Sequence, residues 1–240
     1  MFYICLSVSV LFMMGCRGIV ALLVCIVGVA AAAPCLDCVE DATSAKPVDA
    51  VLYYESMCPY CRMFITTQLY PAFTALHSRV LNVTIVPYGN ARERQRNGSW
   101  KFACQHGAVE CLGNLIAACA LKYTSYKAAH YMPFINCMEL STTHGQELSA
   151  LHKCAAANKV SEDDVLTCMK NKDGENLMHH MALKTEAAKV HYVPWIVVNG
   201  QHTTSIQNSA SAGLMGFLCK TYTGPQPTAC KDLPKPQVVG

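Results

Sequence analysis

Apolar stretches along the chain predict three β-strands, separated by segments with helical spacing. The strand-like runs are rich in β-branched and aromatic residues and span Asp49–Tyr54, Leu81–Pro87 and Trp195–Val198. After the first run, apolar residues between Ile65 and Leu76 recur at the spacing of an amphipathic helix, which Pro71 should kink. The chain therefore begins its folded part as strand, helix, strand.

Residues 103 to about 190 predict helices throughout, with pieces near residues 108–123, 145–158, 161–170 and 174–190. After the third strand, Asn199-Gly200 indicates a hairpin turn whose second arm would be His202–Ile206. A closing helix is expected over Ser211–Tyr222. The segment from Gly89 to Gly98, which holds Arg92, Arg94 and Arg96, is expected to be a loop.

This order of elements predicts an α/β chain with a thioredoxin-like fold and a helical insertion between its two halves. The amino-terminal half would cover residues 48–102, the insertion 103–190 and the carboxyl-terminal half 191–222. A polar segment at residues 34–47 would precede the fold, and a Pro-rich tail at 223–240 would follow it.

Two thiols stand where the first strand meets its helix, in the motif Cys58-Pro59-Tyr60-Cys61. Free N–H groups and the positive end of the helix dipole favour a thiolate there. A thiolate attacks disulfides, and a second thiol nearby resolves the mixed disulfide that results. The motif predicts a thiol–disulfide oxidoreductase that needs no cofactor. The two residues between the cysteines do not determine whether the pair reduces or oxidises its substrates. An oxidase or isomerase of the DsbA type is therefore an alternative.

In a thioredoxin-like fold, a proline precedes the third strand and faces the cysteine pair. Val193-Pro194 holds this place, and we expect the bond between them to be cis. The backbone of Val193 would then be free to pair with a substrate segment. Tyr60, Val193 and Pro194 are therefore the predicted substrate contacts.

The first 33 residues resemble a secretory signal peptide. A single charge, Arg17, precedes the apolar run Ile19–Val29, and small residues close the segment at Ala30–Ala33. Translation from Met13 or Met14 would give a shorter signal, and an uncleaved signal anchor is the rival interpretation. Since no other segment is apolar enough to span a bilayer, cleavage would leave no stable membrane association.

Cysteines and glycosylation acceptors agree with a secretory route. Loss of Cys5, Cys16 and Cys25 with the signal leaves twelve of the 15 cysteines, an even number that suggests pairing. Asn82 and Asn97 begin acceptor sequences for N-glycosylation. The formal net charge of +3 is small and spread along the chain, so no nucleic-acid partner is expected.

Two alternatives to a redox enzyme use the same cysteines. Cys35 and Cys38, together with Cys58 and Cys61, satisfy a common zinc spacing. Against zinc, Cys58 lies at a strand-to-helix junction and an oxidising route would oxidise the first pair, so we expect no metal. The other alternative is a non-enzymatic, disulfide-stapled secreted binding module in which Cys58–Cys61 is inert.

A second motif points to a family: Cys104-Gln105-His106-Gly107, followed by Glu110-Cys111, Asn114 and Cys119. It resembles the signature of the gamma-interferon-inducible lysosomal thiol reductase family, and the segments 86–91, 192–195 and 198–200 resemble other parts of it. The resemblance implies a reductase of protein disulfides in acidic endosomes and lysosomes, or a secreted one. Its partners would be disulfide-bonded proteins and a small-molecule thiol as electron donor. Cys58 and Cys61 would be its active pair.

Within the signature, Gln105 and His106 could be ligands or catalytic helpers, but a structural loop is the preferred interpretation. Gly107 would permit a tight turn there, and Glu110 would lie at a helix start. Glu55 is a candidate proton acceptor three residues before Cys58. Thioredoxins, however, carry their buried acid six residues before the nucleophile.

The remaining cysteines suggest disulfides. Cys111 and Cys119 share a helical face. Each is expected to be buried and to form a disulfide with some other cysteine, rather than to act as a nucleophile. A Cys104–Cys111 bridge requires the helix to begin after Cys104, because seven helical residues would separate the pair by about 10 Å. Cys219 and Cys230 are expected to form a bridge that ties down the tail.

Overall fold

The computed structural model describes residues 45–141, 145–231 and 233. The expected signal peptide, Cys35, Cys38 and most of the Pro-rich tail lie outside the described residues. In chain order the elements are β1 (Val48–Tyr54), α1 (Pro59–Phe64), the π-helix η1 (Ile65–Leu69), α2 (Tyr70–Val80), β2 (Leu81–Pro87), β3 (Arg92–Arg96), β4 (Ser99–Ala103), α3 (Ala108–Tyr123), α4 (Ala128–Ser141), α5 (Glu147–Asn158), α6 (Glu162–Lys170), α7 (Lys172–Ala187), β5 (Trp195–Val198), α8 (Thr204–Thr221) and α9 (Thr228–Lys231).

The three predicted strands form one sheet in the order β2–β1–β5. Strands β1 and β2 are parallel, in a register that runs from Val48 opposite Leu81 to Tyr54 opposite Pro87. Strand β5 is antiparallel to β1, and Trp195 pairs with Tyr53. The bounds of β2 and β5 confirm the prediction, and β1 begins one residue earlier than expected.

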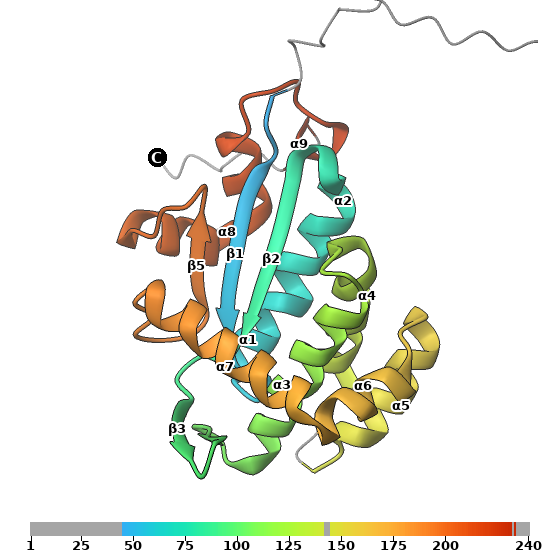
Figure 1. The fold of residues 1–240 in the computed structure, drawn as a ribbon. Coiled ribbons are helices and arrows are strands. Elements are labelled where there is room, and N and C mark those ends of the chain that lie inside the picture. Colours follow the sequence, from blue (N-terminus) through green and yellow to red (C-terminus); the bar gives the residue numbers. More distant parts are fainter. Residues whose placement is uncertain (1–44, 142–144, 232, 234–240) are drawn as a thin grey trace, which may run out of the picture. The chain divides into compact units, whose positions relative to one another are not determined.

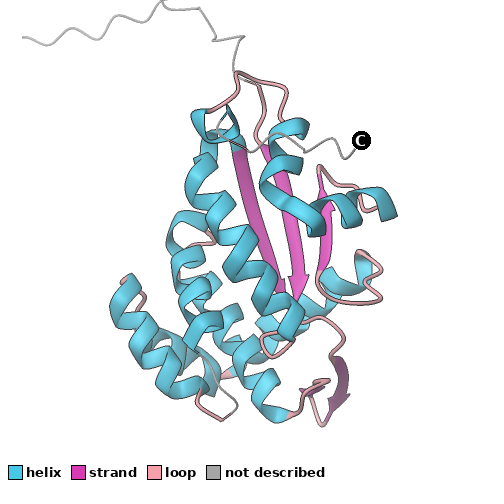
Figure 2. Cartoon of the chain, turned by 180° about the vertical axis from the view of Figure 1, so that it is seen from behind, coloured by secondary structure: helices cyan, strands magenta, loops and turns pink. Residues whose placement is uncertain are grey.

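Helices cover both faces of this sheet. Helix α7 crosses the strands in Figure 1, whereas α2 and α8 lie over the opposite face in the view from behind (Figures 1 and 2). Alternate residues of β1 point into the core: Val48, Ala50, Leu52 and Tyr54 are all buried. At its carboxyl end β1 therefore delivers the chain to the cysteine motif from a fixed, buried strand.

A π-helical segment, η1, takes the place of the kink predicted at Pro71. The Tyr70 N–H donates to the Ile65 carbonyl five residues back, and α2 begins at Tyr70 with Pro71 in its first turn. Proline has no N–H to donate and is tolerated in the first turn of a helix, which is the position that Pro71 has in α2. Helices α1, η1 and α2 thus follow one another without an intervening loop.

The expected loop between Gly89 and Gly98 is wrong over most of its length. Strands β3 and β4 form a two-stranded antiparallel sheet, so Arg92, Arg94 and Arg96 lie on a strand rather than in a loop. The turn is Asn97-Gly98, with φ of 51° and 72°. These are the left-handed conformations that a tight hairpin turn requires and that Asn and Gly tolerate.

The hairpin predicted at Asn199-Gly200 is reduced to a single bridge between Val198 and Gln201. His202–Ile206 is not its second arm, because α8 begins at Thr204, seven residues before the predicted start of the closing helix. The Thr203 side chain accepts a hydrogen bond from the Ile206 N–H at 3.1 Å. This N-cap makes a helix the favoured continuation of the chain.

Five helices, α3 to α7, occupy the stretch predicted to be helical, and the bounds of α3 match the prediction. Helix α4 was not among the predicted pieces, and it contains Pro133. Its neighbours in the helix, including Met132 and Phe134, are fully buried, and packing of this kind overrides a local breaker. Two disulfides fasten the insertion: Cys119–Cys168 joins α3 to α6, and Cys137–Cys154 joins α4 to α5.

Candidate active site

Cys58 is the N-cap residue of α1, and Pro59 occupies the first turn. The Cys61 N–H donates to the Cys58 sulfur at 3.4 Å, and the Arg62 N–H donates to the Cys58 carbonyl at 3.0 Å. Among the cysteines of the described residues, only Cys58 and Cys61 are free thiols. The residue Cys58 is 6% exposed and Cys61 is fully buried, so Cys58 is the more accessible of the two thiols.

The two thiols differ in acidity. A hydrogen bond from the Cys61 thiol is the main reason that the pKa of Cys58 falls to about 6, and the N–H groups of Cys61 and Tyr60 contribute in the same direction. Burial, together with donation to Cys58, raises the pKa of Cys61 above its ordinary range. One sulfur is therefore prepared as a thiolate and the other keeps its proton.

Glu55 lies directly after β1 and is fully buried. The Asn90 N–H donates to its Oε1 at 2.5 Å, and a Cβ at Gly89 (φ 59°) would collide with the Glu55 side chain. Burial raises the pKa of Glu55 to about 7, and the negative charges of Glu110 and Cys58 act in the same direction. The carboxyl group is thus held between Asn90 and His106, close enough to Cys58 for the two charges to interact.

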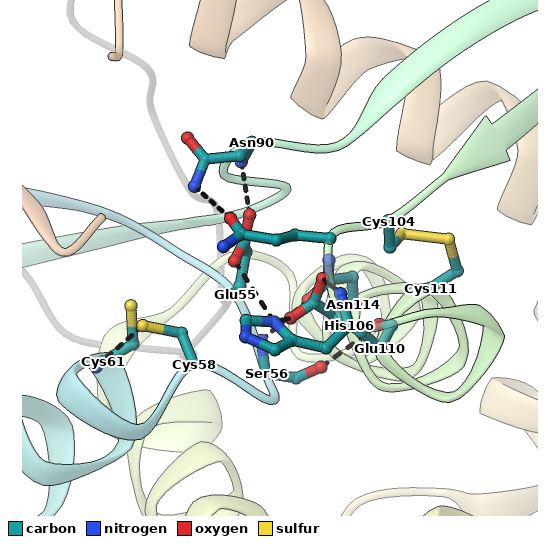
Figure 3. A network of polar contacts seen from close by, with 11 residues as sticks. Glu55, Ser56, Cys58, Cys61, Asn90, Cys104, His106, Glu110, Cys111 and Asn114 are labelled. Atoms are coloured by element: carbon teal, nitrogen blue, oxygen red, sulfur yellow. Dashed lines mark hydrogen bonds and ion pairs between the residues drawn. A yellow bond between two sulfur atoms is a disulfide. The ribbon is translucent and has the colours of Figure 1, made fainter. Parts of the chain in front are cut away.

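The signature motif packs against that same loop (Figure 3). Asn114 Oδ1 accepts the Ser56 N–H at 2.9 Å, and Ser56 Oγ donates to the Glu110 carbonyl at 3.2 Å. A Cβ at Gly113 would collide with the Ser56 side chain, so glycine lets α3 approach the loop closely. The first turns of α3 therefore fix the position of the residues just before Cys58.

His106 connects the two carboxyl groups. The ring Nδ1 of His106 lies 2.5 Å from Glu110 Oε2 and 3.7 Å from Glu55 Oε2. The backbone N–H of His106 donates to Glu110 Oε1 at 3.0 Å. Figure 3 shows the imidazole ring between Cys58 and Glu110. The hydrogen bond to Glu110 raises the pKa of His106, and the charges of Glu110, Glu55 and Cys58 reinforce this effect.

Within the described part of the chain, Glu55, His106 and Glu110 are the one group of side chains close enough to hold a metal ion. Two ligands of a tetrahedral zinc ion, each about 2.0–2.1 Å from the metal, stand about 3.3 Å apart. The 2.5 Å between His106 Nδ1 and Glu110 Oε2 is too short for that, and it is shorter than an ordinary N–H···O hydrogen bond of about 2.7–3.2 Å. His106 and Glu110 are therefore bonded directly to each other, with Glu55 Oε2 3.7 Å from the same nitrogen.

The predicted substrate contacts lie near the end of β1. The Val193–Pro194 bond is cis, and Pro194 immediately precedes the residue that pairs with Tyr53. Gln207 Nε2 donates to the Pro194 carbonyl at 3.1 Å and so ties this turn to α8. Tyr60, within the cysteine motif, is 69% exposed.

The signature and tail cysteines are paired. Cys104 and Cys111 form a disulfide across the start of α3, which begins at Ala108, after Cys104. A disulfide also joins Cys219 in α8 to Cys230 in α9. The glycosylation acceptors Asn82 and Asn97 are both exposed.

Three residues that support the site were not singled out from the sequence. Asn90 holds Glu55, and its Nδ2 also donates to Gln105 Oε1 at 2.7 Å. Ser56 anchors the loop to α3. Glu139, in α4, is a buried acid whose carbonyl accepts from Arg62 Nε at 3.0 Å. A signal was present only for Asn90, which lies in the segment 86–91 that resembles the family.

Known proteins share both the sequence and the fold. The family described as gamma interferon inducible lysosomal thiol reductase matches residues 49–158. A protein of that name from Carassius auratus is 43% identical over 191 residues, which cover 78% of this chain and 73% of the relative. The Mus musculus protein of that name is 35% identical over 192 residues, with 79% and 74% covered.

Among solved structures, oxidised BdbD from Bacillus subtilis superposes with a TM-score of 0.51 at 13% identity, and the match covers 74% of this chain and 91% of BdbD. This likeness shows the fold, and the predicted thioredoxin-like fold is confirmed. The identities over most of the chain show the family. The protein belongs to the gamma-interferon-inducible lysosomal thiol reductase family.

Proposed function

We propose that this thiol–disulfide oxidoreductase works as a reductase of protein disulfides, with Cys58 as the attacking thiolate and Cys61 as the resolving thiol. The observation that carries the proposal is the asymmetry of the pair: Cys58 is acidic and keeps a small exposed area, whereas Cys61 is completely buried and retains its proton. A thiolate is the nucleophile of disulfide exchange.

In the first step Cys58 Sγ attacks one sulfur of the substrate disulfide, and the other sulfur leaves and takes up a proton. Cys61 then loses its proton and attacks Cys58 Sγ, which releases the second substrate sulfur as a thiol. The substrate has gained two electrons and two protons, and Cys58–Cys61 is left as a disulfide. A small-molecule thiol would return the pair to the dithiol state.

The acidity of Cys58 supports work in an acidic compartment. With a pKa of about 6, about a tenth of Cys58 is thiolate at pH 5. An ordinary thiol with a pKa of about 8.5 would have only about 0.03% thiolate at that pH. The names of the relatives place them in the lysosome, and we propose an endosomal, lysosomal or secreted location for this protein.

Entry into the secretory route is part of this proposal. A cleaved signal at residues 1–33 and glycans at Asn82 and Asn97 would accompany it, and the exposure of both asparagines supports their modification. No helix in residues 45–141 and 145–231 is long and apolar enough to cross a bilayer.

Protein substrates would approach along the exposed Tyr60 and the turn before β5. We propose that the Val193 backbone pairs with an extended substrate segment, with Pro194 beside the thiol pair. Family membership favours an enzyme over the disulfide-stapled binding module. The names of the relatives favour reduction over the oxidase or isomerase activity of the DsbA type.

A covalent trap tests the assignment of the two cysteines. Cys61→Ser should accumulate a mixed disulfide between Cys58 and a disulfide-bonded protein, because attack survives and resolution does not. Cys58→Ser is the matched control and should form no adduct. Non-reducing electrophoresis and peptide mapping read out the product. If Cys58→Ser alone were to trap substrate, the two roles would be reversed.

A further inference from the structure

The proposed mechanism uses two cysteines and leaves a buried acid beside them unexplained. Glu55 is completely buried, and its Oε2 has no hydrogen-bond partner. A buried carboxyl oxygen left without a hydrogen bond is costly. That oxygen points toward His106, whose Nδ1 is 3.7 Å away.

The group is assembled from distant parts of the chain. Glu55 follows β1, His106 precedes α3 and Glu110 lies in the first turn of α3. Anchoring of the loop does not depend on His106, because Ser56 is bonded to Asn114 and to the Glu110 carbonyl. The His106 ring is therefore free to serve another purpose, and it lies between Glu110 and Cys58 (Figure 3).

We propose that Glu55, His106 and Glu110 are positioning residues that share protons next to Cys58 and stabilise its thiolate under acidic conditions. The inference rests on the proposed function, since it assigns a role at the same site. His106 supplies the positive charge, Glu110 holds that charge in place, and Glu55 is the carboxyl group that becomes neutral as the pH falls.

The charges follow from the surroundings of each group. Once Glu55 loses its proton as the pH rises past about 7, its negative charge adds to that of Glu110 next to Cys58, and a single positive charge on His106 offsets only one of them. The cluster then opposes a thiolate at Cys58. Because burial raises the pKa of Glu55 to about 7, Glu55 is neutral at pH 5 and the positive charge of His106 then balances Glu110. The thiolate gains electrostatic support as the solution becomes more acidic.

Other ionisable groups around Cys58 do not supply this effect. Cys61 donates to Cys58 in its neutral form, and its raised pKa keeps it neutral. Glu139 is buried, and burial raises its pKa despite Arg62, whose Nε lies 3.7 Å from Glu139 Oε2. Tyr54 is buried with a raised pKa and stays a neutral phenol. Of the groups that act on Cys58, His106 is the one whose positive charge lowers its pKa.

The test is the rate of Cys58 alkylation by iodoacetamide from pH 4 to pH 9, measured on the reduced full-length protein by mass spectrometry of the Cys58 peptide. His106→Asn should lower the rate at pH 5 about threefold, no more than Cys61→Ala does, because His106 contributes less than Cys61 to the lowered pKa of Cys58. His106→Lys, which keeps a positive charge, should retain most of the rate. Glu55→Gln, which is neutral at every pH, should stay within twofold of wild type at pH 5. Circular dichroism establishes that each variant is folded.

A matched control is His179→Asn. His179 Nδ1 lies 2.7 Å from Glu93 Oε1, a pair of the same chemistry between α7 and β3 that does not act on Cys58. This variant should alkylate at the wild-type rate. An unchanged rate in His106→Asn would overturn the inference, as would an equal loss in Glu55→Gln, which would indicate a purely structural role.

The readout separates this inference from the proposed function. If the protein reduces disulfides but His106→Asn leaves the rate of Cys58 alkylation unchanged, the proposed role of the cluster is wrong and the proposed function stands. Conversely, if the protein reduces no disulfides but His106→Asn lowers the rate of Cys58 alkylation, the proposed role of the cluster stands and the proposed function is wrong.

Discussion

The hydrogen bond from Cys61 to Cys58 sets the reactivity of the site, and Cys61→Ala removes it. The Cys61 thiol is the largest single cause of the lowered pKa of Cys58. A hydrogen bond to a charged group contributes about 1.5–3 kcal/mol, and one pKa unit corresponds to about 1.4 kcal/mol. The pKa of Cys58 should therefore rise from about 6 by about 1–2 units in Cys61→Ala.

The expected loss of rate is smaller than the loss of thiolate. At pH 5 the thiolate population should fall about 10- to 100-fold in Cys61→Ala. Each remaining thiolate is more nucleophilic, by about 3- to 8-fold for a Brønsted coefficient of about 0.45. The net alkylation rate at pH 5 should thus fall about 3- to 12-fold.

Thiolate absorbance at 240 nm during a pH titration measures the midpoint directly, and Cys61→Ser serves as the comparison. The serine hydroxyl keeps a donor at this position, so its midpoint should lie between those of wild type and Cys61→Ala. A Cys61→Ala midpoint within about 0.3 units of wild type would refute the reasoning, because the hydrogen bond would then contribute under about 0.5 kcal/mol.

Two further predictions concern stability. Because the pKa of Glu55 in the fold is about 7 and its ordinary value is 4.5, Glu55 stabilises the protein in acid and that stability is lost as the pH rises through 7. Between pH 5 and pH 7, the free energy of unfolding measured in urea should fall by about 2 kcal/mol more for wild type than for Glu55→Gln. Equal decreases in the two proteins would contradict the raised pKa of Glu55. Replacing Cys219 and Cys230 by alanine opens a loop of 11 residues and should cost about 3 kcal/mol, against about 4 for the 49-residue Cys119–Cys168 loop. Thermal unfolding that ranks the two double variants the other way would reject this entropic account.

Elements with a strong local signal could be predicted from the sequence. The β-branched run Leu81–Pro87 is β2, and the continuous helix formers of Ala108–Tyr123 are α3. Strand β3 carries no apolar alternation, because Arg92 and its neighbours face solvent. Its only clear signal was the Asn97-Gly98 turn. At Thr203 a local cap to the Ile206 N–H prevailed over the expected second hairpin arm.

The candidate site, like the fold, has a part that could be predicted from the sequence and a part that could not. Cys58 and Cys61 could be found from their spacing and their place after a strand, since the chemistry is local. The contact between Glu55 and His106 joins residues 51 positions apart in the sequence, and it exists because α3 packs on the loop before Cys58. Periodicity describes one element at a time and does not report such a contact. The signature motif could be recognised, but its position beside the thiol pair required the structure.

The most direct test of the account is reduction of a disulfide-linked two-chain protein at pH 5, with a small-molecule thiol as electron donor. The wild-type protein should release the separated chains far faster than the small thiol alone, because about a tenth of Cys58 is thiolate at that pH. Cys58→Ser should give only the rate of the small thiol. A wild-type rate no higher than that of the small thiol would contradict the central claim that Cys58 and Cys61 reduce protein disulfides in acid.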